Sequence, residues 1–330
     1  MARVAAVIPH WNRRDLLLNI LESLRGQTRA FDQIIVVDNG STDDSAETAG
    51  DAGATVLRLE TNQGFAVAVN RGVQKAIDAG ADWIAILNND VTLASDWLEG
   101  LLESAEKHSA WFATGKILSA QNPALVDGTF DELARSGCAW RCGAGNRDGP
   151  PWNTLRRIRM APMTAALFRA ELFKEIGLLE ERFGSYLEDV DFGLRAALAG
   201  LSGVYEPRVI AHHRGSSTLG KWNKDTVFLI SRNQVLLVRK YYVGQSLIPV
   251  LVGQLLWVLL AARHGRGWAA LVGKLAGIRS PQHFHSEKSR FKSKYKLGEV
   301  LEEGEKTICE LGSQAGLDRY WRAYFCLSRR

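Results

Sequence analysis

Residues 83–91 read WIAILNNDV, an apolar run that stops abruptly at two amides and an acid. The run has the length and composition of a buried strand. A turn would explain its polar end in the simplest way, because Asn and Asp are favoured in turns. Alternatively, the strand presents Asp90 at the carboxyl edge of a sheet, where open α/β sheets bind their ligands.

The first half of the sequence alternates between strand and helix patterns. Short apolar runs predict strands at 3–10, 33–38, 54–60 and 83–87. Apolar residues at helical spacing predict helices at 14–27, 64–80 and 95–108. This alternation over short connections predicts an α/β fold, with a doubly wound mixed, mostly parallel sheet flanked by helices.

The second half is less regular. Between about 119 and 159 the chain is rich in Gly, Pro, Asn and Arg and loses its periodicity, which is typical of a functional or mobile loop. An acidic stretch follows at 186–201, and a predicted strand at 203–213 ends in a His pair. The pattern after 224 is helical and predicts a C-terminal helical extension.

The formal net charge of +5 is concentrated near the C-terminus. Residues 263–296 carry nine basic side chains and one acid, directly after the uncharged stretch 241–262. This pairing indicates an anionic membrane surface rather than nucleic acid, because the basic residues form no recognised nucleic-acid module. Three interpretations of 241–262 remain open: an interfacial helix or hairpin, helices packed on protein, and a membrane span.

Cysteine usage and the N-terminus both indicate a cytoplasmic protein. The chain opens MARVAAVIPHWN, without the apolar core of a signal peptide. Cys138 and Cys142 form the closest pair among four cysteines, and no second pair supports a zinc site. We therefore expect free thiols.

Polar residues follow several of the predicted strands, so we expect them to converge on one crevice. No GxGxxG and no Walker loop is present, so a ligand there would be held by acids, amides and an Arg. Oxygen and imidazole ligands around Asp90 would suit Mg²⁺ or Mn²⁺, with phosphates completing the shell. A separate carboxylate would be needed as general base for an incoming hydroxyl.

Six motifs in order resemble glycosyltransferase family 2, of the GT-A fold, and its bacterial rhamnosyltransferase-like branch. They read VIPHWNR, IIVVDNGSTDDS, NQGFAVAVNRGV, LNND, YLEDVDFGLRA and HHRGSST, and they lie within about residues 1–240. The resemblance implies a catalytic domain at 1–240, with nucleotide-sugar binding in 1–118 and acceptor binding and catalysis in 119–240. Residues 241–330 would form the helical C-terminal region.

The resemblance also implies an activity. We expect an inverting, metal-dependent enzyme that moves a sugar from a nucleotide diphosphate to a hydroxyl. The candidate sugar is L-rhamnose, and its donor would be dTDP-rhamnose. The acceptor would be a glycan or polyprenyl-linked saccharide of cell-surface polysaccharide synthesis, met at the inner face of the cell membrane. Oligomers are possible.

Site residues follow from the same resemblance. The implied substrate-binding residues are Pro9, His10, Asn12, Asp38, Arg71, Asn88, Asn89 and Glu188. The implied metal ligands are Asp90 and one of the His pair, with His212 preferred over His213. Asp189 is the expected catalytic base, and Asp191 is its main rival.

Each assignment has a simpler alternative. Acids are favoured in the first turn of a helix, and Asp191 and Arg195 have the spacing of a helical ion pair. The His pair could lack a role.

The family's first metal-site acid is replaced by Asn88, so metal binding would depend more on the diphosphate and on His212. That substitution also keeps open a catalytically inactive homologue that acts as an assembly partner. A nucleotidylyltransferase or a processive synthase is disfavoured, because neither a Gly-rich loop after the first strand nor QxxRW is present.

Overall fold

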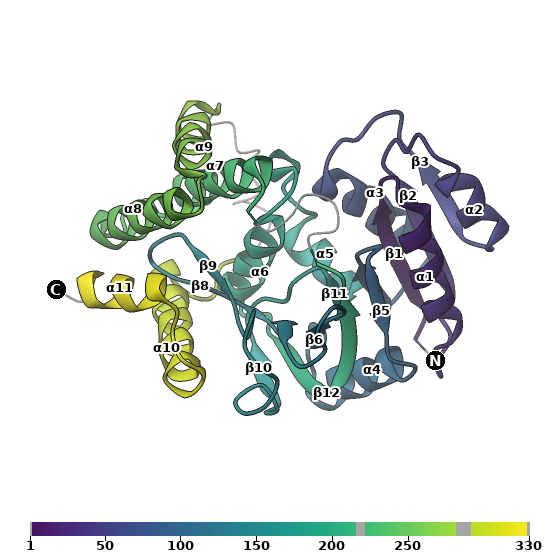
Figure 1. Ribbon diagram of the computed structural model, residues 1–330. Helices are drawn as coiled ribbons and strands as arrows, with labels where there is room; N and C mark the ends of the chain where they lie inside the picture. Colours follow the sequence, from purple (N-terminus) through teal and green to yellow (C-terminus); the bar gives the residue numbers. More distant parts are fainter. Residues whose placement is uncertain (1, 216–221, 282–291, 329–330) are drawn as a thin grey trace.

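The computed structural model describes residues 2–215, 222–281 and 292–328. Ten strands in this part of the chain form one mixed sheet in the order β10-β12-β6-β11-β4-β1-β2-β3, with β5 beside β12 and β7 beside β6 (Figure 1). The strands are β1 (Val4–His10), β2 (Gln33–Asp38), β3 (Thr55–Arg58), β4 (Trp83–Leu87), β5 (Val91–Leu93), β6 (Phe112–Ser119), β7 (Val126–Gly128), β10 (Arg156–Ile158), β11 (Ala165–Arg169) and β12 (Gly203–His213). Strands β4, β1, β2 and β3 are parallel, and β11 joins them antiparallel to β4.

Helices cover both faces of this sheet, as predicted. The helices of the sheet region are α1 (Arg14–Arg25), α2 (Ser45–Asp51), α3 (Phe65–Asp78), α4 (Trp97–Lys107), α5 (Ala170–Ile176) and α6 (Glu188–Ala199). Apolar residues of α3, α5 and α6 form one buried cluster with the sheet, and those of α1 and α4 form another. The predicted doubly wound α/β fold is therefore confirmed.

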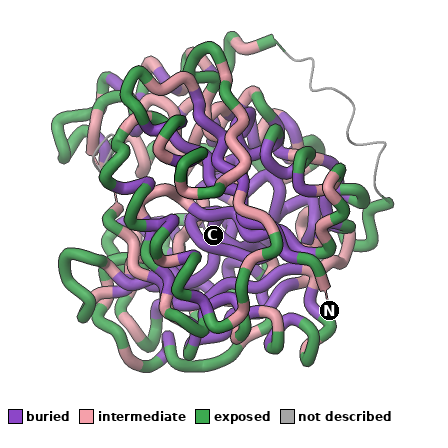
Figure 2. Tube along the Cα trace, turned by 90° about the vertical axis from the view of Figure 1, so that its right-hand side faces the viewer, coloured by how far each residue is buried: buried purple, intermediate pink, exposed green. Residues whose placement is uncertain are grey.

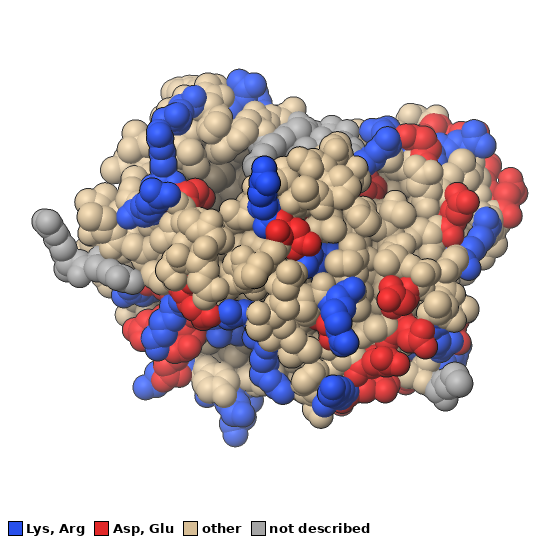
Figure 3. Space-filling model, turned by 60° about the horizontal axis from the view of Figure 1, so that its bottom comes forward, with Lys and Arg blue, Asp and Glu red and all other residues tan. Residues whose placement is uncertain are grey.

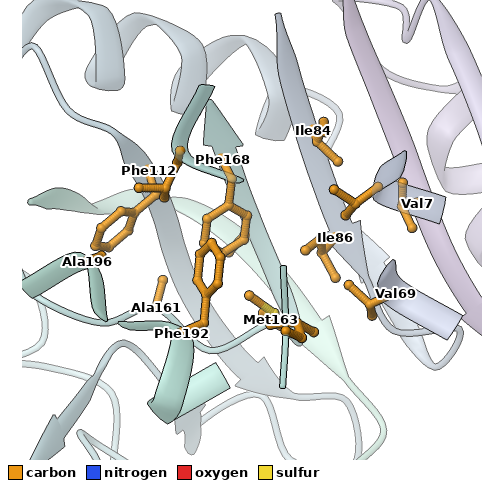
Figure 4. Close-up of a cluster of buried hydrophobic side chains, with 14 of the residues drawn as sticks. Val7, Val69, Ile84, Ile86, Phe112, Ala161, Met163, Phe168, Phe192 and Ala196 are labelled. Carbon is orange, nitrogen blue, oxygen red and sulfur yellow. The ribbon is translucent and has the colours of Figure 1, made fainter. Parts of the chain in front are cut away.

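The run Trp83–Leu87 is the central strand β4, and all five of its residues are buried. Ile84 and Ile86 point into the cluster with α3, where Figure 4 shows them beside Val7 and Val69. The alternate residues of the run point into the cluster with α1 and α4. A fully buried Ile side chain contributes roughly 1.5–3 kcal/mol, so burial on both faces holds this strand firmly in place.

The irregular segment 119–159 is more ordered than its sequence indicates. Besides β7 and β10, it contains β8 (Asp131–Leu133) and β9 (Ala139–Arg141), which pair as a separate two-stranded sheet. The prediction of a loop was wrong here, because three-residue strands are too short to show an alternating pattern.

In the described residues after the sheet the chain forms five helices, which in Figure 1 gather on the side of the molecule away from β1–β3. They are α7 (Lys224–Tyr241), α8 (Leu247–Arg263), α9 (Gly267–Arg279), α10 (Leu297–Ala315) and α11 (Arg319–Ser328). Helix α9 packs along α7, while α8 contacts α9 and α11. Within the described ranges, no helix is long and apolar enough to cross a membrane.

The uncharged stretch forms most of α8, and only one side of that helix is covered. Val250, Gly253 and Ala261 are buried. The exposed apolar faces of α8 and α9 consist of Leu247, Ile248, Leu251, Leu255, Leu259, Trp268, Leu271, Leu275 and Ile278. Figure 2 shows that most exposed segments surround a buried interior. Such a set of large apolar side chains in solvent is unusual and marks an interaction surface.

One residue of the basic block beside this stretch, Lys274, is only partly exposed. Lys274 lies inside the helical region, where its ammonium contacts the side-chain oxygens of Gln234 and Gln254. The other described residues of the block are exposed: Arg263, Arg266, Arg279, Lys292, Lys294 and Lys296. Two further basic residues of the block, Lys288 and Arg290, lie outside the described residues.

Candidate active site

The ends of β1 and β2 lie side by side, as the sequence predicts. His10 is in register with Asp38, and both side chains are buried. Oδ1 of Asp38 accepts a hydrogen bond from the backbone of Ser41 at 3.1 Å. The carboxylate therefore shapes the turn that follows its strand, beside the imidazole of His10.

The turns after these two strands are joined through Asn12. Its backbone N–H donates to Oγ of Ser41 at 2.8 Å, and its Oδ1 accepts from the backbone of Thr42 at 2.9 Å. Asn12 has a positive φ of 54°, which Asn tolerates better than most residues. Pro9 is buried opposite Val37 on the neighbouring strand. Both predicted residues thus belong to the structure of this edge.

His10 connects the first strand to the NND triplet. Nδ2 of Asn89 donates to Nδ1 of His10 at 2.9 Å. Burial lowers the pKa of His10 to about 4, although the charge of Asp38 opposes the shift, so the ring is neutral near pH 7. Its Nε2 is buried and has no hydrogen-bond partner among the described residues. An acceptor on a ligand would satisfy that donor, which otherwise costs about 1–3 kcal/mol.

Asp90 contacts the end of β12 through His213. Nε2 of His213 lies 3.1 Å from Oδ1 of Asp90, and its Nδ1 lies 2.8 Å from Oδ2 of Asp127. Burial lowers the pKa of His213, but hydrogen bonds and the charges of the two carboxylates outweigh it and raise the pKa to about 9. A metal ligand must be a neutral imidazole, so metal binding here would release this proton.

His212 lies next to this cluster without joining it. Its backbone pairs with Thr92 of β5, and the structure records no hydrogen bond of its ring to the described residues. Successive side chains of a strand point to opposite faces, so His212 and His213 cannot both face Asp90. The geometry favours His213, whereas the sequence interpretation preferred His212.

The donor atoms near Asp90 suit a divalent cation but do not complete its shell. One carboxylate and one imidazole match Mn²⁺ or Mg²⁺. In the described part of the chain, no group of three or more His, Cys, Asp or Glu side chains is arranged to hold a metal. Asp90 and His213 would therefore need oxygen ligands from a diphosphate.

Asp189 lies in the first turn of α6, behind two residues in the left-handed region. Tyr186 has a φ of 73° and Leu187 one of 66°, a strained conformation for side chains of this size. Oδ2 of Asp189 lies 3.4 Å from Nη2 of Arg141, whose Nε lies 3.2 Å from Asp131. Burial and the charge of Asp131 raise the pKa of Asp189 to about 6, against the pull of Arg141.

Glu188 directly precedes Asp189 and has a different environment. It is buried, and its Oε2 has no hydrogen-bond partner in the described chain. Burial and the negative charge of Asp189 raise the pKa of Glu188 well above its usual value. Glu188 therefore favours the neutral acid, while Asp189 is the member of the pair that ionises more readily.

Asp191, the rival base, is fully buried in an ion-pair network. It lies 3.0 Å from Arg195 and 2.7 Å from Lys240, and its Oδ1 accepts from the hydroxyl of Tyr241 at 2.8 Å. Burial raises its pKa, but the two cations outweigh burial and lower it. The predicted pair with Arg195 is confirmed, and the network joins α6 to α7.

The LNND turn is linked to Asp189 by a chain of contacts. The backbone N–H of Asn88 donates to the carbonyl of Thr164 at 2.9 Å. Nη1 of Arg141 donates to Oγ1 of Thr164 at 3.3 Å, and Nη2 of the same guanidinium reaches Asp189. The structure therefore brings the metal-side triplet and the acidic helix to one region. Arg71, by contrast, is exposed on α3 and forms no ion pair with the described residues.

Sequence reasoning missed three residues of this region: Asp127, Asp131 and Arg141. All three lie in the irregular segment 119–159, and each contacts a predicted site residue or its partner. The acids and the Arg were visible in the sequence, but no periodic pattern placed them.

Comparisons with known proteins identify the family. A model of the family described as Glycosyl transferase family 2 matches residues 5–177. The chain is 30% identical over 241 residues to an N-acetylglucosaminyl-diphospho-decaprenol L-rhamnosyltransferase of Mycobacterium tuberculosis, covering 64% of this chain and 74% of the relative. It is 28% identical over 285 residues to a pre-mycofactocin glycosyltransferase of the same organism, covering 84% of this chain and 57% of that protein.

Among solved structures, the chain is similar to one described as GalNAc-T7 with UDP, GalNAc and Mn²⁺. The TM-score is 0.65 at 15% identity, over 96% of this chain and 58% of the other. This likeness concerns the fold, and it agrees with the GT-A architecture. The family match over residues 5–177, more than half of the chain, shows that the chain belongs to glycosyl transferase family 2 and is a glycosyltransferase.

Proposed function

We propose that this glycosyltransferase is inverting and metal-dependent, and that it moves a sugar from a nucleotide diphosphate to a hydroxyl of a glycan or lipid-linked saccharide. The chain of contacts from Asn88 through Thr164 and Arg141 to Asp189 carries this proposal. It joins a metal-side turn to a carboxylate that can act as general base. Similarity to an L-rhamnosyltransferase supports dTDP-L-rhamnose as donor and cell-surface polysaccharide synthesis as the process.

In this mechanism Asp189 accepts the proton of the acceptor hydroxyl. The hydroxyl oxygen forms a bond to the anomeric carbon from one side while the bond to the diphosphate breaks on the other, which inverts the configuration. Asp90 and His213 would hold Mg²⁺ or Mn²⁺, and such an ion stabilises the negative charge of the leaving diphosphate. His213 replaces His212 as our first candidate, because its Nε2 lies 3.1 Å from Asp90.

The donor would lie along the edge formed by β1, β2 and β4. The proposed donor-binding residues are Pro9, His10, Asn12, Asp38, Arg71, Asn88 and Asn89, with Glu188 near the acceptor. His10 is the best supported of these, because its buried Nε2 lacks a partner in the described chain. Its low pKa leaves a neutral donor for a carbonyl of the base.

We further propose that residues 1–240 are the catalytic domain and that 241–296 makes peripheral contact with the inner face of the cell membrane. The exposed apolar faces of α8 and α9 would enter the lipid interface. Arg263, Arg266 and Arg279 lie at the ends of these two helices, where they would meet anionic headgroups. Contact with the membrane would bring the active site to a polyprenyl-linked acceptor.

We do not propose nucleic acid as a partner, because the basic residues of 263–296 form no recognised nucleic-acid module in the sequence. Figure 3 shows a face of the molecule on which Lys and Arg are interspersed with Asp and Glu.

Thermal unfolding with a panel of nucleotide sugars, with and without Mn²⁺, tests the donor. A ligand at about 100 times its Kd adds ~2.7 kcal/mol to stability, so the true donor should raise Tm only together with the metal. Transfer to a synthetic polyprenyl-diphosphate saccharide, with the anomeric configuration of the product determined, tests the reaction.

The main alternative is a catalytically inactive homologue that acts as an assembly partner at the membrane surface. Asn88, where the family carries an acid, favours it. Absence of transfer or hydrolysis with every donor, despite donor binding, would support that alternative and contradict ours.

A further inference from the structure

The imidazole of His213 has a second carboxylate partner on the side away from Asp90. Its Nδ1 lies 2.8 Å from Oδ2 of Asp127, a residue of β7 that is 86 positions away in sequence. The two ring nitrogens therefore have different carboxylate partners. Asp127 lies outside the six motifs of the family resemblance, so its role has to be derived from this geometry.

The backbone of His213 is fixed without help from Asp127. β12 pairs with β5 and β6 up to this residue. The carbonyl of His213 accepts from the backbone of Ala120 at 2.9 Å, and the N–H of Arg214 donates to the carbonyl of Asp90 at 3.0 Å. These bonds fix the position of the Cα atom but not the rotation of the ring. Asp127 is the contact that orients the Nδ1 side.

Orientation also determines the tautomer. In the neutral ring that a metal ligand requires, a carboxylate that accepts from Nδ1–H keeps the remaining proton on that nitrogen and leaves the lone pair on Nε2. In this structure Nε2 is the atom that faces Asp90, at 3.1 Å. One cation could therefore be reached by Oδ1 of Asp90 and by Nε2 of His213 at the same time. Carboxylates in this position orient histidine ligands and increase their basicity in metal sites generally.

We propose that Asp127 is a positioning residue for the metal site, which holds His213 so that Nε2 is the atom that binds the cation. This inference rests on the proposed function, because it assumes a metal at Asp90. Asp127 would not touch the cation itself. Its side chain is 28% exposed, so its replacement should leave the fold intact.

The test is Mn²⁺ binding to the full chain, measured by electron paramagnetic resonance with dTDP or UDP present. The signal of unbound Mn²⁺ gives the affinity of the protein for the ion. Electron spin echo modulation from ¹⁴N reports whether an imidazole nitrogen is bound to the Mn²⁺. We expect Asp127→Ala to weaken Mn²⁺ binding about 10–100-fold and to reduce the ¹⁴N modulation. Asp127→Asn should lose less of the Mn²⁺ affinity and of the ¹⁴N modulation, because the amide oxygen can still accept a hydrogen bond from Nδ1–H of His213.

The matched control is Asp148→Asn. Asp148 is also a partly exposed acid of the irregular segment, 34% exposed, and it pairs with Lys116 at 2.7 Å instead of a histidine. Its replacement should leave both signals unchanged. His213→Ala should remove the ¹⁴N modulation, and His212→Ala should retain it.

The outcomes separate this inference from the proposed function. If His213→Ala loses the modulation while Asp127→Ala keeps wild-type affinity and modulation, the metal site stands and the role of Asp127 is wrong. If Asp127→Ala binds Mn²⁺ more weakly but keeps the ¹⁴N modulation, Asp127 acts as a ligand or through its negative charge. This result would also overturn the positioning role. A wild-type protein that binds no Mn²⁺ would overturn both the metal site and the inference.

Discussion

Nη2 of Arg141 lies 3.4 Å from Oδ2 of Asp189, although 48 positions separate the two residues in sequence. The same guanidinium also contacts Asp131 and Thr164. One cation thus faces the proposed base and a second acid. Its charge keeps Asp189 ionisable near neutral pH despite burial.

We expect Asp189→Asn to abolish most of the catalysis while the donor still binds. The amide has nearly the shape of the carboxylate but cannot take up the proton of the acceptor hydroxyl. General base catalysis typically contributes 10²–10⁴-fold to the rate, so kcat should fall by about that factor. Steady-state kinetics give kcat, and donor titration gives Kd. Full activity with unchanged donor affinity would show that another group is the base.

Catalysis should also depend on pH through the same carboxylate. Because the base must be ionised, kcat/KM should fall as the pH drops through about 6, the pKa of Asp189. The charged or titratable groups that face it are Glu188, Asp131 and Arg141. Arg141 lowers this pKa, so Arg141→Gln should move the acid limb to higher pH, whereas Arg141→Lys should move it less. A limb that stays in place in Arg141→Gln would contradict this assignment.

Asp191 should affect stability, because its partners hold α6 against α7. Removal of one member of a buried ion pair typically costs 3–5 kcal/mol. Asp191→Asn removes the carboxylate that lies closest to Lys240, which keeps only the longer contact of 3.6 Å with Glu180, and it also removes the ion pair with Arg195, so we expect a loss of about that size. Asp189→Asn is the comparison and should unfold at a similar urea concentration to the wild type. Because the pKa of Asp191 is below its usual 3.8, this stabilisation is present above that value and is lost as the pH falls through the lowered pKa.

Much of the sheet and its edge was predictable, because the information is local. The run Trp83–Leu87 is apolar throughout, and it forms a strand buried on both faces. His10 and Asp38 end neighbouring parallel strands, so their side chains had to lie close together. The position of Asp90 was predictable for the same reason, because it comes shortly after the end of β4, a parallel neighbour of β1.

The residues around Asp90 and Asp189 were not predictable, because their contacts join distant segments. Asp127 and Arg141 come from strands of three residues, in a segment without periodicity. The choice between His212 and His213 depends on the register of β12 against β5, which places one of the two side chains on the same face as Asp90, and a pair of identical residues gives no sign of that register. For α8, an almost wholly apolar helix does not reveal which of its sides packs on protein.

Vesicle binding should depend on the exposed apolar faces of α8 and α9. Each fully buried Leu contributes roughly 1.5–3 kcal/mol, so Leu251→Glu with Leu255→Glu should weaken binding about tenfold or more. We expect the wild type to sediment with vesicles that contain phosphatidylglycerol, more weakly with neutral ones, and the double variant to stay in solution. Leu18→Glu is the matched control, because Leu18 is also an exposed helical leucine, on α1. The contrary outcome is a wild type that does not bind vesicles but dimerises in solution, together with a double variant that is a monomer. In that case these faces are a protein interface and the membrane proposal is wrong.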